Sequence, residues 1–278
     1  MRIWIFCIVF LFSCKKNDIA IPTYFQLNSI DFEDNINGES SSSKINDVWF
    51  YVNDQKQGIY ELPCTFPVIG NGINEIKIFS GIKVNGISAT RDIYPFYETY
   101  DTTLTFYSDS ILVLNPKTRY KKNLKFYLED FDGIGNNFDI SVNSDTNFII
   151  PFVTDSVYEN ISKIGKVVIN EPFLNFEATT FEIDDFPGAG SPVYLEMDYK
   201  NNSSFIIGTY INYSQSVIKK SIISINPSEE WNKIYINLTP TINESIGALS
   251  FKVFISMLRP ENKQSIELSI DNFKIIYQ

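Results

Sequence analysis

The sequence contains no histidine and only three cysteines among its 278 residues. Without histidine, the chain cannot build a Ser-His-Asp or Cys-His nucleophile system, a histidine general base or an imidazole-ligated zinc or iron site. Cys7 and Cys14 belong to an N-terminal segment typical of export, which leaves Cys64 alone in the mature chain. No disulfide framework is therefore expected. We predict that Cys64 is a small buried apolar residue.

Basic residues are also scarce, with 23 Lys and Arg against 33 Asp and Glu and a formal net charge of −10. Nucleic-acid backbones and anionic lipid surfaces are bound through basic patches, so neither is expected as a partner. Residues 115–123 form one basic, proline-containing segment. We interpret this segment as a solvated linker at a domain boundary.

A convincing helical period is missing throughout the sequence. Aromatic residues make up 15% of the chain, and together with recurrent Ile, Val and Thr they favour β-strands. Turn residues recur about every 8–12 positions, a spacing typical of β-sandwiches and jelly rolls. We therefore predict an all-β protein with two domains, a small β-sandwich over residues 23–116 followed by a larger β-sandwich or jelly roll over residues 124–278. Whether residues 81–116 complete the first domain stays open.

The N-terminal segment has the layout of an export signal. Arg2 precedes an apolar run over residues 3–12, which is followed by the small residue Ser13. The run is too short to cross a bilayer, because crossing requires roughly 20 apolar residues. The tetrapeptide Leu11-Phe12-Ser13-Cys14 resembles the lipobox of bacterial lipoproteins.

The lipobox resemblance implies that residues 1–13 are a cleaved signal peptide and that Cys14 carries acyl chains such as palmitate. Residues 14–22 would then form a tether between the membrane and the fold. Acyl chains hold a protein at a bilayer, which implies a cell-envelope location at the outer membrane or cell surface. The alternatives are an ordinary secretory signal with an incidental cysteine, or a buried apolar segment.

The first domain begins with a clear strand pattern. Over residues 47–53, Val48, Phe50 and Val52 alternate with side chains that face the other way, which predicts a strand. The prolines of residues 60–68 restrict that run to an edge or irregular strand. The order Val52-Asn53, Gly58, Leu62-Pro63-x-Thr65-x-Pro67, Gly72 and Ile76-x-Ile78 resembles the PEGA-type domain, a small β-sandwich of cell-surface proteins. The resemblance implies a fold and a surface setting, and no catalytic residue.

Two late segments of the second domain carry another resemblance. Residues 230–238 and 266–275 are similar to strands of the galactose-binding-like jelly roll found in many carbohydrate-binding modules, in which a Trp opens one strand and an Asp-Asn pair interrupts the last. The apolar alternation of the last strand breaks at Asp271-Asn272, which predicts a bulge. The resemblance implies a structural calcium ion near Asp271, with Glu129 as a possible partner. Residues 130–139 also carry alternating aspartates that suit calcium, but an ordinary Asp/Gly/Asn turn is favoured there.

Strand alternation also predicts a polar and aromatic face in the second domain. Val193, Leu195, Met197 and Tyr199, and likewise Ile234, Ile236 and Leu238, fall on the core side. The opposite face then collects the candidate glycan-binding residues Tyr194, Glu196, Asp198, Trp231, Lys233 and Tyr235, and the same pattern turns Lys252 and Phe254 outward. Aromatic planes stack on sugar rings, and carboxylates, amides and amines bind hydroxyl groups. Alternatively, these residues reflect β propensity and cross-strand pairing, or they are covered by a loop or by the first domain.

These patterns favour non-catalytic glycan binding by a lipid-anchored envelope protein, with no catalytic residue assigned. The alternative is a structural or adhesion lipoprotein that binds a protein partner. A glycoside hydrolase comes third: Glu196 and Asp198 share a strand face about 7 Å apart, which suits a carboxylate pair, but such pairs are common on solvated strands.

Overall fold

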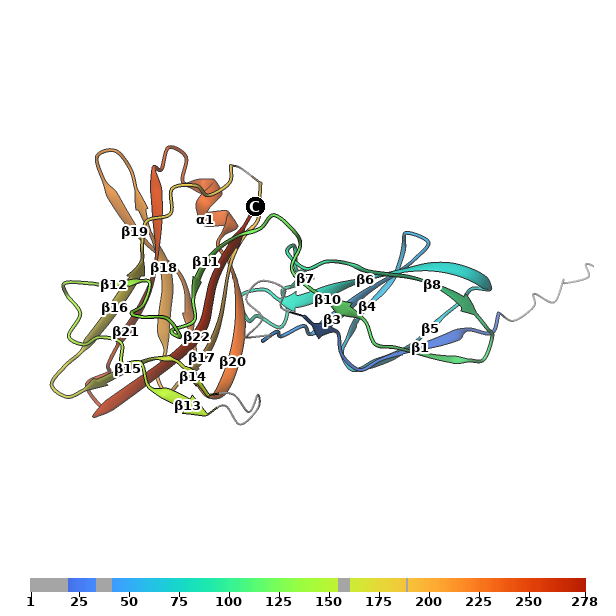
Figure 1. Cartoon of the computed structure of the whole chain (residues 1–278), viewed down its shortest axis with the longest axis horizontal. Helices are drawn as coiled ribbons and strands as arrows, with labels where there is room; N and C mark the ends of the chain where they lie inside the picture. The colour runs from blue at the N-terminus through green and yellow to red at the C-terminus, as the bar shows by residue number, and fades with distance from the viewer. Residues whose placement is uncertain (1–19, 34–41, 155–160, 189) are drawn as a thin grey trace, which may run out of the picture.

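The computed structural model describes residues 20–33, 42–154, 161–188 and 190–278, and nearly all of the regular secondary structure in these residues is β-strand. The all-β prediction is therefore confirmed. Two β-sandwich bodies lie end to end in an elongated molecule (Figure 1). The predicted signal peptide, Cys14 and most of the predicted tether lie outside the described residues. In the described part of the chain, no helix is long and apolar enough to cross a bilayer.

The N-terminal domain packs a three-stranded sheet against a five-stranded sheet. The smaller sheet has the order β5-β1-β9, and the larger has the order β4-β3-β6-β7 with β8 also paired to β6. A short parallel pair, β10 with β2, lies near the second domain (Figure 1). The strands are β1 (Thr23–Leu27), β2 (Asp31–Phe32), β3 (Asp47–Val52), β4 (Gln55–Glu61), β5 (Cys64–Val68), β6 (Gly72–Lys83), β7 (Arg91–Ile93), β8 (Tyr100–Phe106), β9 (Ile111–Leu114) and β10 (Lys117–Thr118).

The predicted alternation of β3 is confirmed. Val48, Phe50 and Val52 are buried in a core that includes Phe25 of β1 and Phe66 of β5. The proline-bearing strand β5 lies at a sheet edge, as its sequence predicts, because proline cannot donate to a second neighbour.

The C-terminal domain is a sandwich of two five-stranded sheets. One has the order β11-β22-β17-β20, with β15 also paired to β22, and the other has the order β12-β16-β21-β18-β19. A small hairpin, β13 with β14, lies beside them. The strands are β11 (Lys125–Glu129), β12 (Phe138–Ile140), β13 (Phe152–Thr154), β14 (Ile161–Lys163), β15 (Gly165–Asn170), β16 (Asn175–Thr180), β17 (Val193–Asn201), β18 (Phe205–Asn212), β19 (Val217–Ile225), β20 (Ser228–Asn237), β21 (Ser250–Leu258) and β22 (Ser265–Tyr277).

The core of this domain lies between the two sheets and confirms the predicted core faces of β17 and β20. The predicted bulge at Asp271-Asn272 is also confirmed, because the β17–β22 register shifts there and Asn272 has a φ of 50°. One short helix was not predicted: α1 (Thr239–Glu244) has a proline in its first turn and is too short to show a period.

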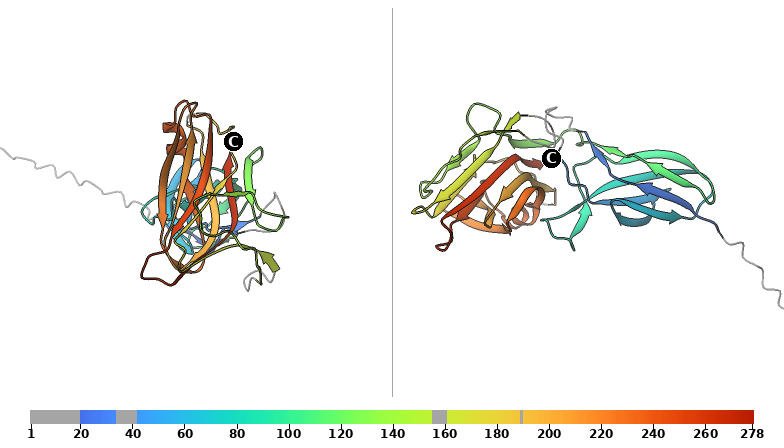
Figure 2. Two further views of the ribbon diagram at one scale, coloured as in Figure 1. Left: turned by 90° about the vertical axis from the view of Figure 1, so that its left-hand side faces the viewer. Right: turned by 90° about the horizontal axis from the view of Figure 1, so that it is seen from below.

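The two domains share a continuous interface. The sheet β11-β22-β17-β20 faces the N-terminal domain, and the sheet β12-β16-β21-β18-β19 lies on the far side of the sandwich (Figures 1 and 2). An aromatic cluster joins the domains: Ile82, Val84, Tyr94, Phe96, Tyr97 and Tyr120 from one side pack with Tyr194, Tyr235 and Ile276 from the other. The second domain therefore has one covered and one open sheet.

Candidate functional site

The candidate glycan face of β17 and β20 lies inside the interface between the domains. Tyr194, Glu196, Lys233 and Tyr235 are each 7% exposed or less. They do point away from the core of the second domain, as alternation predicts, but the N-terminal domain covers them. The expectation that these four side chains are exposed is therefore wrong. Asp198 is partly buried, and Trp231 at 41% is the one candidate on the open surface.

A buried ion cluster lies at the centre of this interface. The Lys233 ammonium lies 3.1 Å from the Glu196 carboxylate and 3.9 Å from Asp198. Two tyrosine hydroxyls donate hydrogen bonds to Glu196: that of Tyr94, which follows β7 of the N-terminal domain, at 2.6 Å, and that of Tyr120, in the segment that joins the domains, at 3.1 Å. Burial and the nearby Glu196 charge keep the pKa of Tyr94 well above its ordinary value, so its hydroxyl stays a donor. Burial alone would lower the pKa of Lys233, but Asp198 and Glu196 outweigh it and hold that pKa above the ordinary value.

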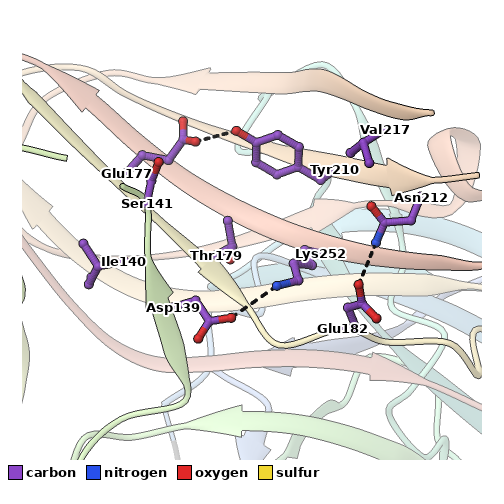
Figure 3. Close-up of a pocket in the computed structure, with 10 residues that line it drawn as sticks. All are labelled: Asp139, Ile140, Ser141, Glu177, Thr179, Glu182, Tyr210, Asn212, Val217 and Lys252. Carbon is purple, nitrogen blue, oxygen red and sulfur yellow. Dashed lines mark hydrogen bonds and ion pairs between the residues drawn. The ribbon is translucent and has the colours of Figure 1, made fainter. Parts of the chain in front are cut away.

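An open groove lies on the other sheet of the second domain, on the side away from the interface (Figure 3). Its volume is about 350 Å³. It is lined by Asp139, Ile140, Ser141, Glu177, Thr179, Glu182, Tyr210, Asn212, Val217 and Lys252. These residues come from strands β12, β16, β18, β19 and β21 and from the segments directly after β12 and β16, so the groove runs across the whole sheet.

Strand register explains how the groove side chains meet. Lys252 of β21 lies opposite Tyr210 of β18, and Tyr210 lies opposite Lys219 of β19. Two residues further along β21, Phe254 lies opposite Thr179 of β16 on one side and opposite Gly208 of β18 on the other. Side chains in these two rows share the outward face because strand residues two apart point the same way.

Glu177 organises one side of the groove. Its carboxylate accepts a hydrogen bond of 2.5 Å from the Tyr210 hydroxyl and pairs with the Lys219 ammonium. That ammonium also lies over two rings, 5.3 Å from the centroid of Tyr210 and 4.7 Å from that of Phe254. Phe254 is consequently only 1% exposed although it belongs to the outward face.

The pKa shifts of Tyr210 and Lys219 favour the ion pair between Lys219 and Glu177. Burial, together with the hydrogen bond to Glu177, raises the pKa of Tyr210 above its ordinary value. Burial lowers the pKa of Lys219, but its contacts with Glu177 and Tyr210 outweigh this and raise that pKa above the ordinary value. At neutral pH the tyrosine is therefore a neutral donor and the lysine a cation.

The other side of the groove presents polar groups in pairs. Lys252 lies 3.2 Å from the Asp139 carboxylate, and the Asn212 amide donates to Glu182 at 3.2 Å (Figure 3). The same amide donates to the Ser250 hydroxyl at 2.8 Å. Each of these groups has capacity left for a ligand, because carboxylates accept several hydrogen bonds and an ammonium donates three. The groove thus offers closely spaced donors and acceptors beside a tyrosine ring.

Glu129 and Asp130, two of the candidate calcium ligands, accept hydrogen bonds from backbone N–H groups. Glu129 is buried and accepts hydrogen bonds from the backbone N–H groups of Phe131, at 2.6 Å, and Asn137. Asp130 accepts from the backbone of Asp132 at 3.2 Å, the hydrogen bond of an ordinary aspartate turn. Within the described ranges, no group of three or more acidic or thiol side chains is arranged to hold a metal ion.

Asp271 gives the protein a predicted pH dependence. Burial raises the pKa of Asp271 to about 8, with Asp198 adding to the effect. The folded state then keeps a proton that the unfolded chain releases, so stability should fall as the pH rises from about 4 to about 8, by at most about 1.4 kcal/mol per pH unit. Asp271→Asn should remove this slope in denaturation curves measured across that range. The exposed Asp184→Asn serves as control, and an unchanged slope in Asp271→Asn would contradict the assignment.

Sequence reasoning missed most of the groove. Lys252 and Phe254 were predicted to face outward, but they were grouped with β17 and β20, which belong to the other sheet. Alternation gives the side of a strand on which a residue lies, and it does not say which sheet the strand joins. No local signal connects Glu177 with Tyr210 or Lys219, because the register of separate strands brings them together.

No protein-family model and no curated protein matches the sequence. Among solved structures, a family 11 carbohydrate-binding module from Clostridium thermocellum, in complex with a β-1,3-1,4-mixed-linked tetrasaccharide, is 14% identical with a TM-score of 0.37, covering 55% of this chain and 94% of the module. A xylan-binding domain from CBM 22 is 13% identical with a TM-score of 0.38, covering 56% of this chain and 96% of that domain. The enzymatically active domain of tailspike protein 4 from bacteriophage CBA120 is 15% identical with a TM-score of 0.40, over 53% of this chain. The match spans only 20% of the tailspike structure.

Proposed function

We propose that this protein is a lipid-anchored component of the cell envelope that binds glycans without catalysis, through the groove on the sheet β12-β16-β21-β18-β19. The observation that carries the proposal is the groove itself, an open cleft of about 350 Å³ with a tyrosine ring among paired polar side chains. It belongs to the second domain, as the sequence predicts for glycan binding, but it lies on the opposite sheet.

The chemistry of the groove suits a polyol. A sugar ring presents an apolar C–H face and a rim of hydroxyl groups that donate and accept at the same time. Tyr210 supplies a flat apolar surface, and Glu177, Asn212 and Lys252 supply acceptors and donors around it. In the groove lining, the carboxylates of Asp139, Glu177 and Glu182 outnumber the ammonium of Lys252. We therefore expect neutral rather than acidic sugars.

The carboxylates favour binding over hydrolysis. A glycosidase needs two opposed carboxyl groups that are free to exchange protons with the substrate. In the groove, Asp139 is paired with Lys252 and Glu177 with Lys219. Glu196, one member of the carboxylate pair considered from the sequence, is fully buried beneath Tyr94 and Tyr120. These contacts give Asp139, Glu177 and Glu196 structural roles.

The anchor is proposed from the sequence. Residues 1–14 carry the apolar run and the Leu-Phe-Ser-Cys motif, and acylation at Cys14 would hold the folded domains at a membrane. Mass spectrometry of the mature protein tests this directly. A chain that starts at Cys14 and carries acyl groups supports the anchor, and a chain without them rejects it.

The binding proposal predicts that Tyr210→Ala weakens glycan binding about ten-fold or more, equivalent to at least 1.4 kcal/mol. A glycan array containing neutral polysaccharides identifies a ligand, and calorimetry then measures the affinity of each variant. Trp231→Ala is the matched control, because this exposed aromatic belongs to the other sheet.

The two variants separate the alternatives. Loss of binding in Trp231→Ala with normal binding in Tyr210→Ala would place the site at the edge of the domain interface and reject the groove. Absence of binding to every glycan by the folded protein would instead favour the structural or adhesion alternative.

A further inference from the structure

The end of the N-terminal domain farthest from the second domain is built by three segments. Residues 20–24, 68–73 and 105–111 meet there, and we call them the apolar tip. Thr23 lies opposite Val68 in the sheet, and its hydroxyl donates a hydrogen bond of 2.8 Å to the Tyr107 carbonyl. The N–H of Asp109 donates to the Pro22 carbonyl at 3.0 Å. These contacts fix the three segments as one surface.

Large apolar side chains protrude from this surface. Ile21, Ile69, Ile73, Tyr107 and Ile111 are each between 52% and 75% exposed. Asp109 is the only charged residue in the three segments, although charged residues make up 20% of the chain. Exposed apolar groups gathered where charge is depleted mark a surface that contacts something apolar.

The position of the tip identifies its partner. The described chain begins at Ala20, at the free end of the N-terminal domain (Figure 1). The six peptide units between Cys14 and Ala20 span at most about 22 Å, so an acylated Cys14 would hold this end close to the bilayer. We propose that the apolar tip lies in the interfacial region of the membrane and contacts lipid directly. This inference rests on the lipid anchor of the proposed function.

The composition of the tip fits a lipid surface. Tyrosine is favoured at the boundary between headgroups and acyl chains, and isoleucine gains free energy by leaving water there. The net charge of the protein is −10, which disfavours binding to anionic lipids, but the tip itself carries only Asp109. A zwitterionic surface is therefore the matching partner. With the tip on the membrane, the groove would lie at the opposite, outermost end of the molecule (Figures 1 and 2).

The test places a tryptophan at the tip of the acylated full-length protein. Tyr107→Trp is reconstituted into phosphatidylcholine vesicles with brominated acyl chains, and quenching is measured relative to the wild-type protein. We expect quenching of Tyr107→Trp and none of Ile246→Trp, a control at a position that is 88% exposed on the second domain. Adding Ile69→Asp and Ile73→Asp to the Tyr107→Trp variant should reduce the quenching about two-fold or more, because two charges then oppose insertion.

The outcomes distinguish the tip from the anchor. If Tyr107→Trp is quenched no more than Ile246→Trp while the protein stays on the vesicles, the tip proposal fails and the anchor stands. If the mature protein lacks acyl groups, the anchor fails, and quenching of the unacylated chain mixed with the same vesicles decides the tip. A concentration-dependent dimer that Ile73→Asp dissociates, without quenching by lipid, would identify a second copy as the partner and overturn the proposal.

Discussion

Replacing Lys233 by methionine is expected to lower the free energy of unfolding by about 3–5 kcal/mol. Lys233 forms ion pairs in a buried cluster, and its removal takes away the ammonium that is paired with the carboxylates of Glu196 and Asp198. Tyr94 and Tyr120 still donate hydrogen bonds to Glu196, but a neutral hydroxyl does not balance a fully buried carboxylate. Denaturation followed by fluorescence measures the loss.

Lys220→Met is the matched control for this prediction. Lys220 forms an ion pair of 2.7 Å with Glu244, at a site where both side chains are well exposed. Solvent screens such a pair, so we expect a loss below about 1 kcal/mol. If Lys233→Met costs no more than Lys220→Met, then water reaches the cluster and the two domains are not firmly docked in solution.

A second substitution separates charge from packing. Adding Glu196→Gln to Lys233→Met removes one of the two uncompensated charges, and Gln can still accept hydrogen bonds from both tyrosines. The double variant should therefore be more stable than Lys233→Met alone, which would be a favourable coupling in a double-mutant cycle. Additive losses would show that Lys233 contributes by filling space.

This cluster also shows how far the sequence alone could lead. Alternation placed Glu196, Lys233 and Tyr235 correctly on the face away from the core of their own domain, because the two-residue period of a strand is a local property. The burial of that face by the N-terminal domain depends on contacts between residues far apart in the sequence. Tyr94 meets Glu196 across 102 positions of the chain, and only the docking of two finished domains brings them together.

The groove illustrates the same limit within one domain. Lys252 and Phe254 were predicted to point outward, and they do, but the sheet that they join depends on pairing between β21 and its neighbours β16 and β18. The fold class was predictable because composition and turn spacing act everywhere along the chain. A site assembled from five strands depends on register, which a single sequence specifies only through the complete packing of the core.

Gly208 lies in a part of β18 that has no room for a side chain. It lies opposite Phe254, and a Cβ atom added there would stand 2.4 Å from the Phe254 ring and 2.5 Å from the Lys220 carbonyl oxygen. The ring therefore occupies the space that a side chain on β18 would fill. Because the second contact is with backbone, the ring cannot relieve the clash alone.

Gly208→Ala is accordingly expected to destabilise the protein by about 1–3 kcal/mol and to weaken glycan binding about ten-fold. The displaced ring of Phe254 would push against Lys219 and against Tyr210, the aromatic residue of the groove lining. Thermal unfolding and calorimetric titration measure the two effects. Gly188→Ala is the control, because a Cβ atom there meets nothing within 4 Å.

Shortening the opposing side chain tests the cause of these losses. Phe254→Leu alone should be destabilising, because it removes a ring that is packed between Gly208 and the Lys219 ammonium. Combined with Gly208→Ala, it removes the clash with the ring and leaves the clash with the Lys220 carbonyl, so the double variant should be more stable than the sum of the single losses predicts but less stable than Phe254→Leu alone. If the two losses simply add, the ring does not lie over Gly208, and the side of the groove formed by Tyr210 and Glu177 is built differently. If they compensate while glycan binding stays weak, then the Phe254 ring also holds Tyr210 in the position that the ligand requires.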